Sequence, residues 1–280
     1  MNLIASWIRR HPLAAFFLLA YTISWLPWLL GALAPAIGPF VSYPFFTPGP
    51  LLAALIVIPI TRGRAGLRAL AVSMLRWRVS WRWYALALGF PLTVALGAVL
   101  LNILLGAPAP ALAKLGPWYM PLLAFVVRLI NPSDGPLGEE PGWRGFAQLG
   151  LQAGRSPLAA TSILALLATG WHLPLILASG IDQLPPIGLL ATIAVTFWYA
   201  WLFNRSGGSA LMTLVAHAAE GVFLSVAMAG FADAHVMQLF WLYSALWCVV
   251  AIALALFDRR AWRAGRPVAP ASAETIPSMS

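Results

Sequence analysis

Two adjacent glutamates, Glu139 and Glu140, lie with Arg144 in a short polar stretch of an otherwise apolar chain. Two histidines, His172 and His217, follow in separate apolar runs. Ionisable side chains are costly at membrane depth, and those found there usually have a function. A carboxylate and two imidazoles from three segments can activate a water molecule and stabilise an oxyanion. These residue types therefore indicate amide hydrolysis.

The spacing of the polar stretch separates its two glutamates. On a helix, Glu140 and Arg144 share one face in the favourable order for an ion pair. Glu139 points about 100° away and is left as the free carboxylate, which is the candidate base. The alternative is the solvated start of a cytoplasmic helix, with Pro141 in its first turn and the acids near the positive end of the helix dipole.

Each histidine also has a purely structural interpretation. Pro174 follows His172 closely and would kink a helix there, so this imidazole could simply bridge two helices by a hydrogen bond. The same interpretation applies to His217. Glu220 lies three residues later on nearly the same helical face, where it could orient that imidazole. The histidines point to catalysis only when they are taken together with Glu139.

Glu139, His172 and His217 could instead hold a zinc ion with one open position. The sequence has no His-Glu-x-x-His, which excludes the zincin helix. It also has no Gly-x-Ser-x-Gly elbow, and its single cysteine, Cys248, has no histidine nearby in sequence. The main interpretation therefore requires no cofactor, with a divalent metal such as zinc as the alternative.

Composition places these residues in a membrane. Of the 280 residues, 61% are hydrophobic and 9% are charged, and the mean hydropathy is +0.84. A helix needs about 20 apolar residues to cross a bilayer. We therefore predict an all-α, polytopic membrane bundle of about eight transmembrane helices. The apolar runs lie at about 13–34, 47–61, 83–105, 117–131, 156–178, 186–203, 208–229 and 236–257.

The cations predict the orientation of this bundle. Nearly all of them lie in alternate connections, so the positive-inside rule predicts that both termini are cytoplasmic. Lys114 is the exception in an outer loop, and Arg128 is expected to snorkel from the inner end of its run. The net charge of +9 is spread along the chain, so we expect a lipid bilayer as partner and no nucleic acid. The bias toward arginine and alanine favours a bacterial inner membrane.

We expect one integral membrane domain over residues 1–265 and a disordered cytoplasmic tail over 266–280. The first apolar run is longer than that of a signal peptide and is expected to be a retained span. Residues 63–82 alternate arginine with apolar side chains, which predicts an amphipathic segment at the inner surface. His11 and His235 are expected to be solvated.

Three motifs resemble those of the CAAX protease and bacteriocin-processing (CPBP) family of intramembrane endopeptidases. Gly135–Gly145 is similar to the Glu-Glu-x-x-x-Arg motif of that family, and Trp171–Leu175 is similar to its second motif. Asn204–Ser209, followed by His217, is similar to the approach to its third motif. The similarity covers about 135–222, with the motifs in the family's order.

The resemblance implies a glutamate-dependent protease within the membrane, related to the type II CAAX prenyl endopeptidase. By position, Glu139 would activate the water with His172, while His217 would help to stabilise the oxyanion. Glu140 and Arg144 would support that geometry. The implied substrate is a membrane-associated protein or peptide. The family has been described both as a metalloprotease and as metal-independent, and these residues fit both descriptions.

The chain departs from the family pattern at two positions. Ala168 replaces a Phe that usually lies four residues before the histidine, and we expect Trp171 to supply part of that packing. Gly221 replaces an Asn that usually lies four residues after the third-motif histidine. Loss of an oxyanion donor typically costs about 10²–10³ in rate. Asn204, or Glu220 if protonated, could substitute for it.

Two other functions stay open at this point. Gly221 is compatible with a catalytically weakened or inactive member that acts as a membrane binding or immunity protein. A transporter is the third candidate, because intramembrane acids and histidines also build proton relays. Arg144 argues against transport, since it neutralises charge that a cation path would use. The substrate, the cleavage site and the oligomeric state do not follow from the sequence.

Overall fold

The computed structural model describes residues 3–34, 36, 46–176 and 185–263. Within these ranges all regular structure is helical, which confirms the predicted all-α class. The helical elements are α1 (Leu3–Arg10), α2 (Pro12–Leu33), α4 (Gly49–Met74), α5 (Trp81–Leu104), η1 (Leu112–Leu115), α6 (Met120–Ile130), η2 (Pro132–Asp134), α7 (Pro136–Gly142), η3 (Trp143–Gln148), α8 (Leu149–Gln152), α9 (Pro157–Trp171), α10 (Leu173–Ile176), α11 (Gly188–Arg205), α12 (Ala210–Ala229), α13 (Asp233–Phe257) and α14 (Arg259–Trp262).

Six helical segments among the described residues are long and apolar enough to cross a membrane. They are α2, α4, α5, the segment Leu112–Ile130 that contains η1 and α6, α12, and α13. A shorter apolar helix, α9, has 15 residues. These helices make the chain a multi-pass membrane protein.

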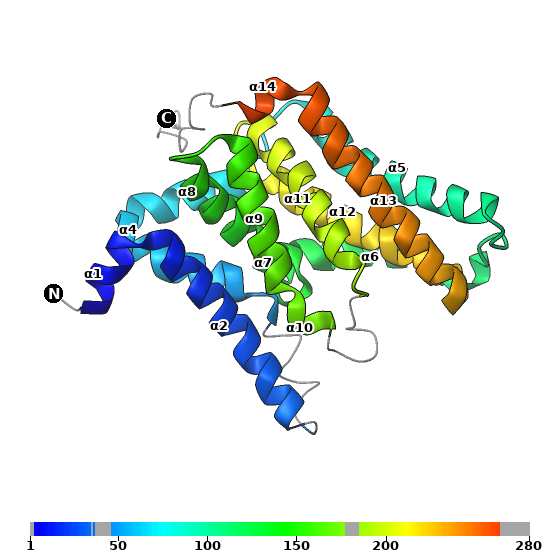
Figure 1. Cartoon of the computed structure of the whole chain (residues 1–280), viewed down its shortest axis with the longest axis horizontal. Coiled ribbons are helices and arrows are strands. Elements are labelled where there is room, and N and C mark those ends of the chain that lie inside the picture. Colours follow the sequence, from blue (N-terminus) through cyan, green and yellow to red (C-terminus); the bar gives the residue numbers. More distant parts are fainter. Residues whose placement is uncertain (1–2, 35, 37–45, 177–184, 264–280) are drawn as a thin grey trace, which may run out of the picture.

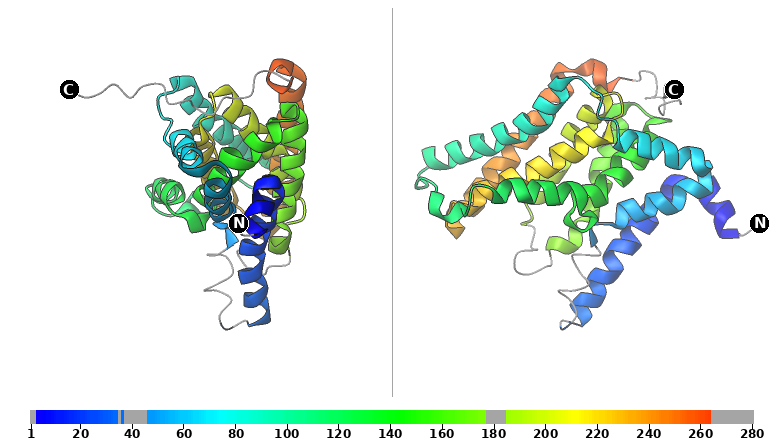
Figure 2. Two further views of the ribbon diagram at one scale, coloured as in Figure 1. Left: turned by 90° about the vertical axis from the view of Figure 1, so that its left-hand side faces the viewer. Right: turned by 180° about the vertical axis from the view of Figure 1, so that it is seen from behind.

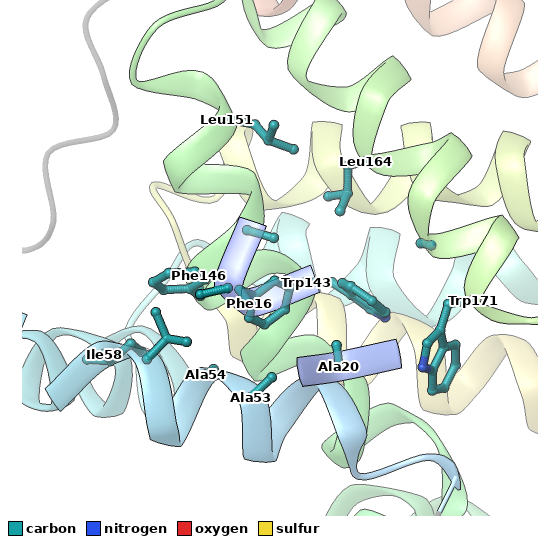
Figure 3. Packing of buried hydrophobic residues seen from close by; sticks show 14 of the residues in the cluster. Phe16, Ala20, Ala53, Ala54, Ile58, Trp143, Phe146, Leu151, Leu164 and Trp171 are labelled. Atoms are coloured by element: carbon teal, nitrogen blue, oxygen red, sulfur yellow. The ribbon is translucent and has the colours of Figure 1, made fainter. Parts of the chain in front are cut away.

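Two buried hydrophobic clusters organise the bundle. The first joins α1, α2 and α4 to η3, α8 and α9, and its central aromatic side chains include Phe16, Trp143 and Trp171 (Figure 3). The second joins α5, α11, α12 and α13. In Figure 1, α2 and α4 extend to one side of the molecule and α5 and α13 extend to the other. Helix α7 packs against α4 of the first group and α12 of the second, so it lies between the clusters.

The run 156–178 is interrupted near Pro174, where the sequence predicted a kink. Helix α9 ends at Trp171, and His172 is its C-terminal cap. Pro174 explains this end, because proline has no N–H to continue the helix and crowds the preceding turn. In α4, Gly63 has φ 60° and ψ −155° and kinks the helix. Beyond it Arg64 and Arg68 are exposed, as an amphipathic segment requires. The predicted tail over 266–280 lies outside the described residues.

Polar contacts join helices at the end of the bundle where α14 lies, which is uppermost in both views of Figure 2. Asp258 accepts hydrogen bonds from Arg205 and from the indole of Trp201, at 2.9 Å for the indole. The bonds from Arg205 lower the pKa of Asp258 below its ordinary value of 3.8. The Ser73 hydroxyl donates to the Gly208 carbonyl at 2.6 Å, which ties α4 to the start of α12. The third-motif segment is thereby held in place.

Candidate active site

The two glutamates lie on a short helix that is forced into the protein interior. Gly135, at φ 87°, precedes α7, and its carbonyl accepts the first helical hydrogen bond, from the Glu139 N–H at 3.0 Å. After Pro141 the helix continues as a π-helical turn, η3, which carries Arg144. Such turns are rare and are frequently found at functional sites. Glu139 is only 6% exposed and Glu140 is fully buried, so the solvated-helix alternative is wrong.

Glycines allow this burial. A Cβ at Gly138 would lie 2.6 Å from the Thr47 carbonyl oxygen, and one at Gly142 would lie 2.4 Å from the Pro50 carbonyl oxygen. Pro50 belongs to α4 and Thr47 directly precedes it, and the Pro132 carbonyl oxygen lies still closer to a Cβ at Gly138, at 2.3 Å. All of these are backbone atoms, so they cannot move away as a flexible side chain could. Small residues four apart let two helix backbones approach closely. The spacing of Gly138 and Gly142 therefore sets the depth of the glutamates between them.

Glu140 is the centre of a buried ion-pair network. Its Oε1 accepts a hydrogen bond from Arg144 Nη1 at 3.2 Å, the ion pair that the spacing predicted. The same oxygen lies 2.9 Å from His217 Nδ1 on α12. Tyr199 of α11 completes the group, with the Arg144 guanidinium 4.9 Å from its ring centroid and the His217 ring stacked at 5.2 Å. One carboxylate thus links α7, η3 and α12.

Glu139 has no charged hydrogen-bond partner in the described part of the chain. Its Oε2 accepts a hydrogen bond from the Trp143 indole at 3.2 Å. Trp143 is itself packed edge-on against Phe16 and Trp171. The indole therefore holds one carboxylate oxygen in a fixed direction and leaves the other, Oε1, beside Gly135. This matches the expectation of a carboxylate that is free to act on a water molecule.

His172 is oriented by the end of α9. Its Nδ1 lies 2.8 Å from the Ala168 carbonyl oxygen. Because a carbonyl only accepts, Nδ1 carries the proton and Nε2 of the neutral ring is an acceptor. The nearby carbonyls of Leu167 and Trp171 accept hydrogen bonds from Tyr21 and Trp25 of α2, which fixes this helix end. The contact at position 168 uses the backbone, so Ala is compatible with it.

Trp171 supplies the aromatic packing that Ala168 lacks. It is fully buried, its ring centroid lies 4.3 Å from that of Phe46, and it meets the His172 ring edge-on at 4.8 Å. The expectation that Trp171 would take over this packing is consistent with these contacts. The imidazole is thus held from two sides.

His217 lies two turns into α12. The Ser209 hydroxyl caps this helix by accepting from the Met212 N–H at 3.4 Å, and Gly207 and Gly208 form the preceding turn with positive φ. The Glu140 carboxylate accepts from Nδ1 of His217, so Nε2 faces away from that pair. This nitrogen is the atom of His217 that can meet a substrate.

Glu139, His172 and His217 lie on three elements that converge around α7. His217 bonds Glu140, the neighbour of Glu139, and the Trp143 indole that bonds Glu139 packs edge-on against Trp171, the neighbour of His172. The sequence predicted such a convergence, and a wide separation of the three side chains would have excluded a common site. The arrangement combines a carboxylate with two imidazoles whose Nε2 atoms have no hydrogen-bond partner among the residues that the structure describes.

The two proposed substitutes for the missing Asn are engaged elsewhere. The carboxylate of Glu220 accepts a hydrogen bond from the Tyr243 hydroxyl of α13, and His217 is bonded to Glu140. The orienting role expected for Glu220 belongs to Glu140 instead. Asn204 accepts hydrogen bonds through Oδ1 from Gln148 and Gln152, both at 3.3 Å, at the end of α11. It therefore braces η3 and α8.

Arg128 has a neighbour that the sequence did not predict. It was expected to snorkel from the inner end of its run, and its guanidinium lies against Gly221 of α12. A Cβ at position 221 would meet Arg128 Nη1 at 2.0 Å and Cζ at 2.8 Å. Arg128 Nη2 also lies 3.6 Å from Asp134 Oδ1, at the approach to α7. The absence of a side chain at residue 221 provides this space.

A metal ion is the alternative use of these side chains. In the ranges that the structure describes, no group of three or more His, Cys, Asp or Glu side chains is placed to hold a metal ion. The zinc set of Glu139, His172 and His217 stays an untested alternative, and no step below uses a metal.

Sequence reasoning missed three contributors. Trp143 lies four residues after Glu139, so helical spacing alone could have linked them. Tyr199 and Arg128 have no such signal, because their partners lie on other helices. Both depend on how α6 and α12 pack against α7 and on how α11 packs against η3 and α12.

Comparison with known families gives one match. Residues 114–223 match the family described as type II CAAX prenyl endopeptidase Rce1-like. This stretch is an Rce1-like domain. It runs from η1 into α12 and includes all of Glu139, His172 and His217, so the resemblance to the CPBP family is confirmed. A comparison with curated proteins gives no match. The Rce1-like domain supports a protease-like enzyme family.

Proposed function

We propose that this protein is an intramembrane endopeptidase that hydrolyses a peptide bond in a membrane-associated protein or peptide. The main support for the proposal is the convergence of the elements that carry Glu139, His172 and His217, within the stretch that matches the Rce1-like family. Each side chain is held by a different contact, and each leaves one polar atom for a reactant. This is the arrangement that water activation requires.

In the proposed reaction, Glu139 Oε1 and His172 Nε2 hold a water molecule. As the water oxygen bonds to the carbonyl carbon of the substrate, its proton passes to Glu139 and the carbonyl oxygen becomes an oxyanion. His217, when protonated, donates from Nε2 to that oxyanion. The tetrahedral intermediate then collapses, the C–N bond breaks, and the leaving nitrogen takes the proton from Glu139.

In this scheme Glu140 and Arg144 are positioning residues. Glu140 fixes the direction of the His217 ring, and Arg144 balances the charge of Glu140, whose side chain is fully buried. Neither group needs to touch the substrate. A buried, paired network of this kind keeps one geometry because each member restrains the next.

We further propose eight crossings in a bacterial inner membrane with both termini cytoplasmic. The six candidate spans, together with α9 and α11, account for eight. The exposed cations Arg78, Arg155, Arg205 and Arg260 then lie on one side, and Lys114 lies on the other. This distribution follows the positive-inside rule.

A second candidate function is a binding or immunity protein descended from the enzyme, because Gly221 lacks the amide that the family motif usually provides. Under that interpretation the network around Glu140 would maintain a binding surface. It predicts that removing Glu139 or His172 leaves the biological effect intact.

The decisive experiment compares the membrane peptidome of cells that express the wild-type protein with those that express Glu139→Ala or His172→Ala. We expect specific cleavage products in the wild type and their loss in both variants, with equal accumulation of folded protein. Cleavage that persists in both variants would refute the proposed mechanism. Arg68→Ala, an exposed position on α4, serves as the control and is expected to keep the products.

A further inference from the structure

We propose that the Arg128 guanidinium acts as the oxyanion donor in place of the missing Asn. The donor then comes from α6 and not from the side chain at residue 221. The inference rests on the proposed function and assigns the donor beside His217. It starts from one steric fact. The Arg128 guanidinium occupies the space where a side chain at residue 221 would begin, with Nη1, Cζ and Nη2 at 2.0, 2.8 and 3.4 Å from a Cβ built there.

The position along α12 is suitable for this role. Residues 217 and 221 lie four apart, so they share one face of the helix at a rise of about 6 Å. Gly221 and His217 are both partly exposed, whereas most of the α12 residues between Ala210 and Ala219 are buried. The Arg128 guanidinium and the His217 ring therefore line the same accessible strip of α12.

The chemistry of the guanidinium also fits. Arginine has five N–H donors in a planar fork, and charge-assisted hydrogen bonds are stronger than those of a neutral amide. Within the described ranges, Arg128 makes no hydrogen bond, and its one ionic contact is the 3.6 Å approach to Asp134. Asp134 restrains the guanidinium loosely and leaves most of its donors available. A negative oxygen that develops beside His217 would meet them.

The placement can be tested without a substrate. Gly221→Ala introduces a methyl group that would overlap the Arg128 guanidinium. We therefore expect a lower unfolding temperature for the purified variant. The same substitution in an Arg128→Ala background should cost clearly less, because the obstacle is gone. Equal losses in the two backgrounds would overturn the inference at the level of structure, whatever the activity.

The catalytic role is tested on a cleavage product identified in the peptidome comparison. Arg128→Ala should lower kcat by about 10²–10³ with little change in KM, as expected for a lost oxyanion donor. Gly221→Asn in the Arg128→Ala background should recover at least tenfold of that loss, because the amide then has room. Arg68→Ala removes an equal charge from an exposed site and should keep the wild-type rate.

The outcomes separate the two proposals. Loss of cleavage in Glu139→Ala together with a wild-type rate in Arg128→Ala would overturn the role of Arg128 alone. Cleavage that is unchanged in Glu139→Ala would overturn the proposed function, and the catalytic role of Arg128 with it. A large loss in Arg128→Ala that the second substitution at residue 221 relieves would support both.

Discussion

At the scale of residues, neighbouring glutamates have different surroundings. Glu140 has two basic partners, Arg144 and His217, whereas the hydrogen-bond partner of Glu139 within the described ranges is the neutral Trp143 indole. A buried carboxylate without a positive partner is costly, so its retention indicates a use other than stability. We therefore propose a structural role for Glu140 and the role of base for Glu139.

This difference predicts opposite effects of two matched substitutions. Glu140→Gln leaves the Arg144 guanidinium, which is 2% exposed, without its anion. Breaking a buried pair from one side costs about 3–5 kcal/mol, so this variant should unfold much more readily. Glu139→Gln should abolish cleavage and change stability by less than about 1 kcal/mol. Unfolding of both purified variants in detergent is the measurement, and equal stability would contradict the assignment.

At the scale of elements, the site depends on how closely α7 approaches α4. Gly142 meets the Pro50 carbonyl with no room for a side chain, and a comparable contact exists at Gly138. On the other side, α12 brings His217 to Glu140. A small displacement of α7 would therefore lengthen the contacts of both glutamates together.

Gly142→Ala tests this dependence. Its Cβ would lie 2.4 Å from a backbone oxygen, and relief requires α7 and α4 to separate. We expect a destabilisation of about 1–3 kcal/mol, typical of overpacking, together with a large loss of cleavage. Gly154→Ala is the matched control, because no atom lies within 4 Å of its Cβ. Similar behaviour of the two variants in thermal unfolding would argue against close backbone packing as the cause.

At the scale of the whole molecule, the site lies between two packed groups of helices. One group is built on α2 and α4 and the other on α5, α12 and α13, and α7 contacts both. The 3.6-residue periodicity says little about such an arrangement, because these helices are apolar on all sides. The exposed arginines are instead the feature that predicts the orientation of the chain in the membrane.

The predicted orientation can be checked by cysteine labelling. In a Cys248→Ala background, Lys114→Cys should react with a membrane-impermeant maleimide added to intact bacterial cells. Arg155→Cys should react only after the membrane is opened. Both side chains are exposed, so reactivity reports the side of the membrane. Labelling of Arg155→Cys in intact cells would require the opposite orientation or a different number of crossings.

The sequence by itself determined the helical membrane class, the three motifs in order, and the pairing of Glu140 with Arg144. These features depend on composition and on contacts one helical turn apart, which the chain encodes locally. Only the tertiary structure decided that Glu140 binds His217, that Glu220 binds Tyr243 instead, and that Arg128 covers Gly221. Each of these pairs joins two helices. These contacts depend on how deeply each helix is buried and on its rotation about its own axis. Close packing sets both, and the spacing of residues along one helix does not encode either.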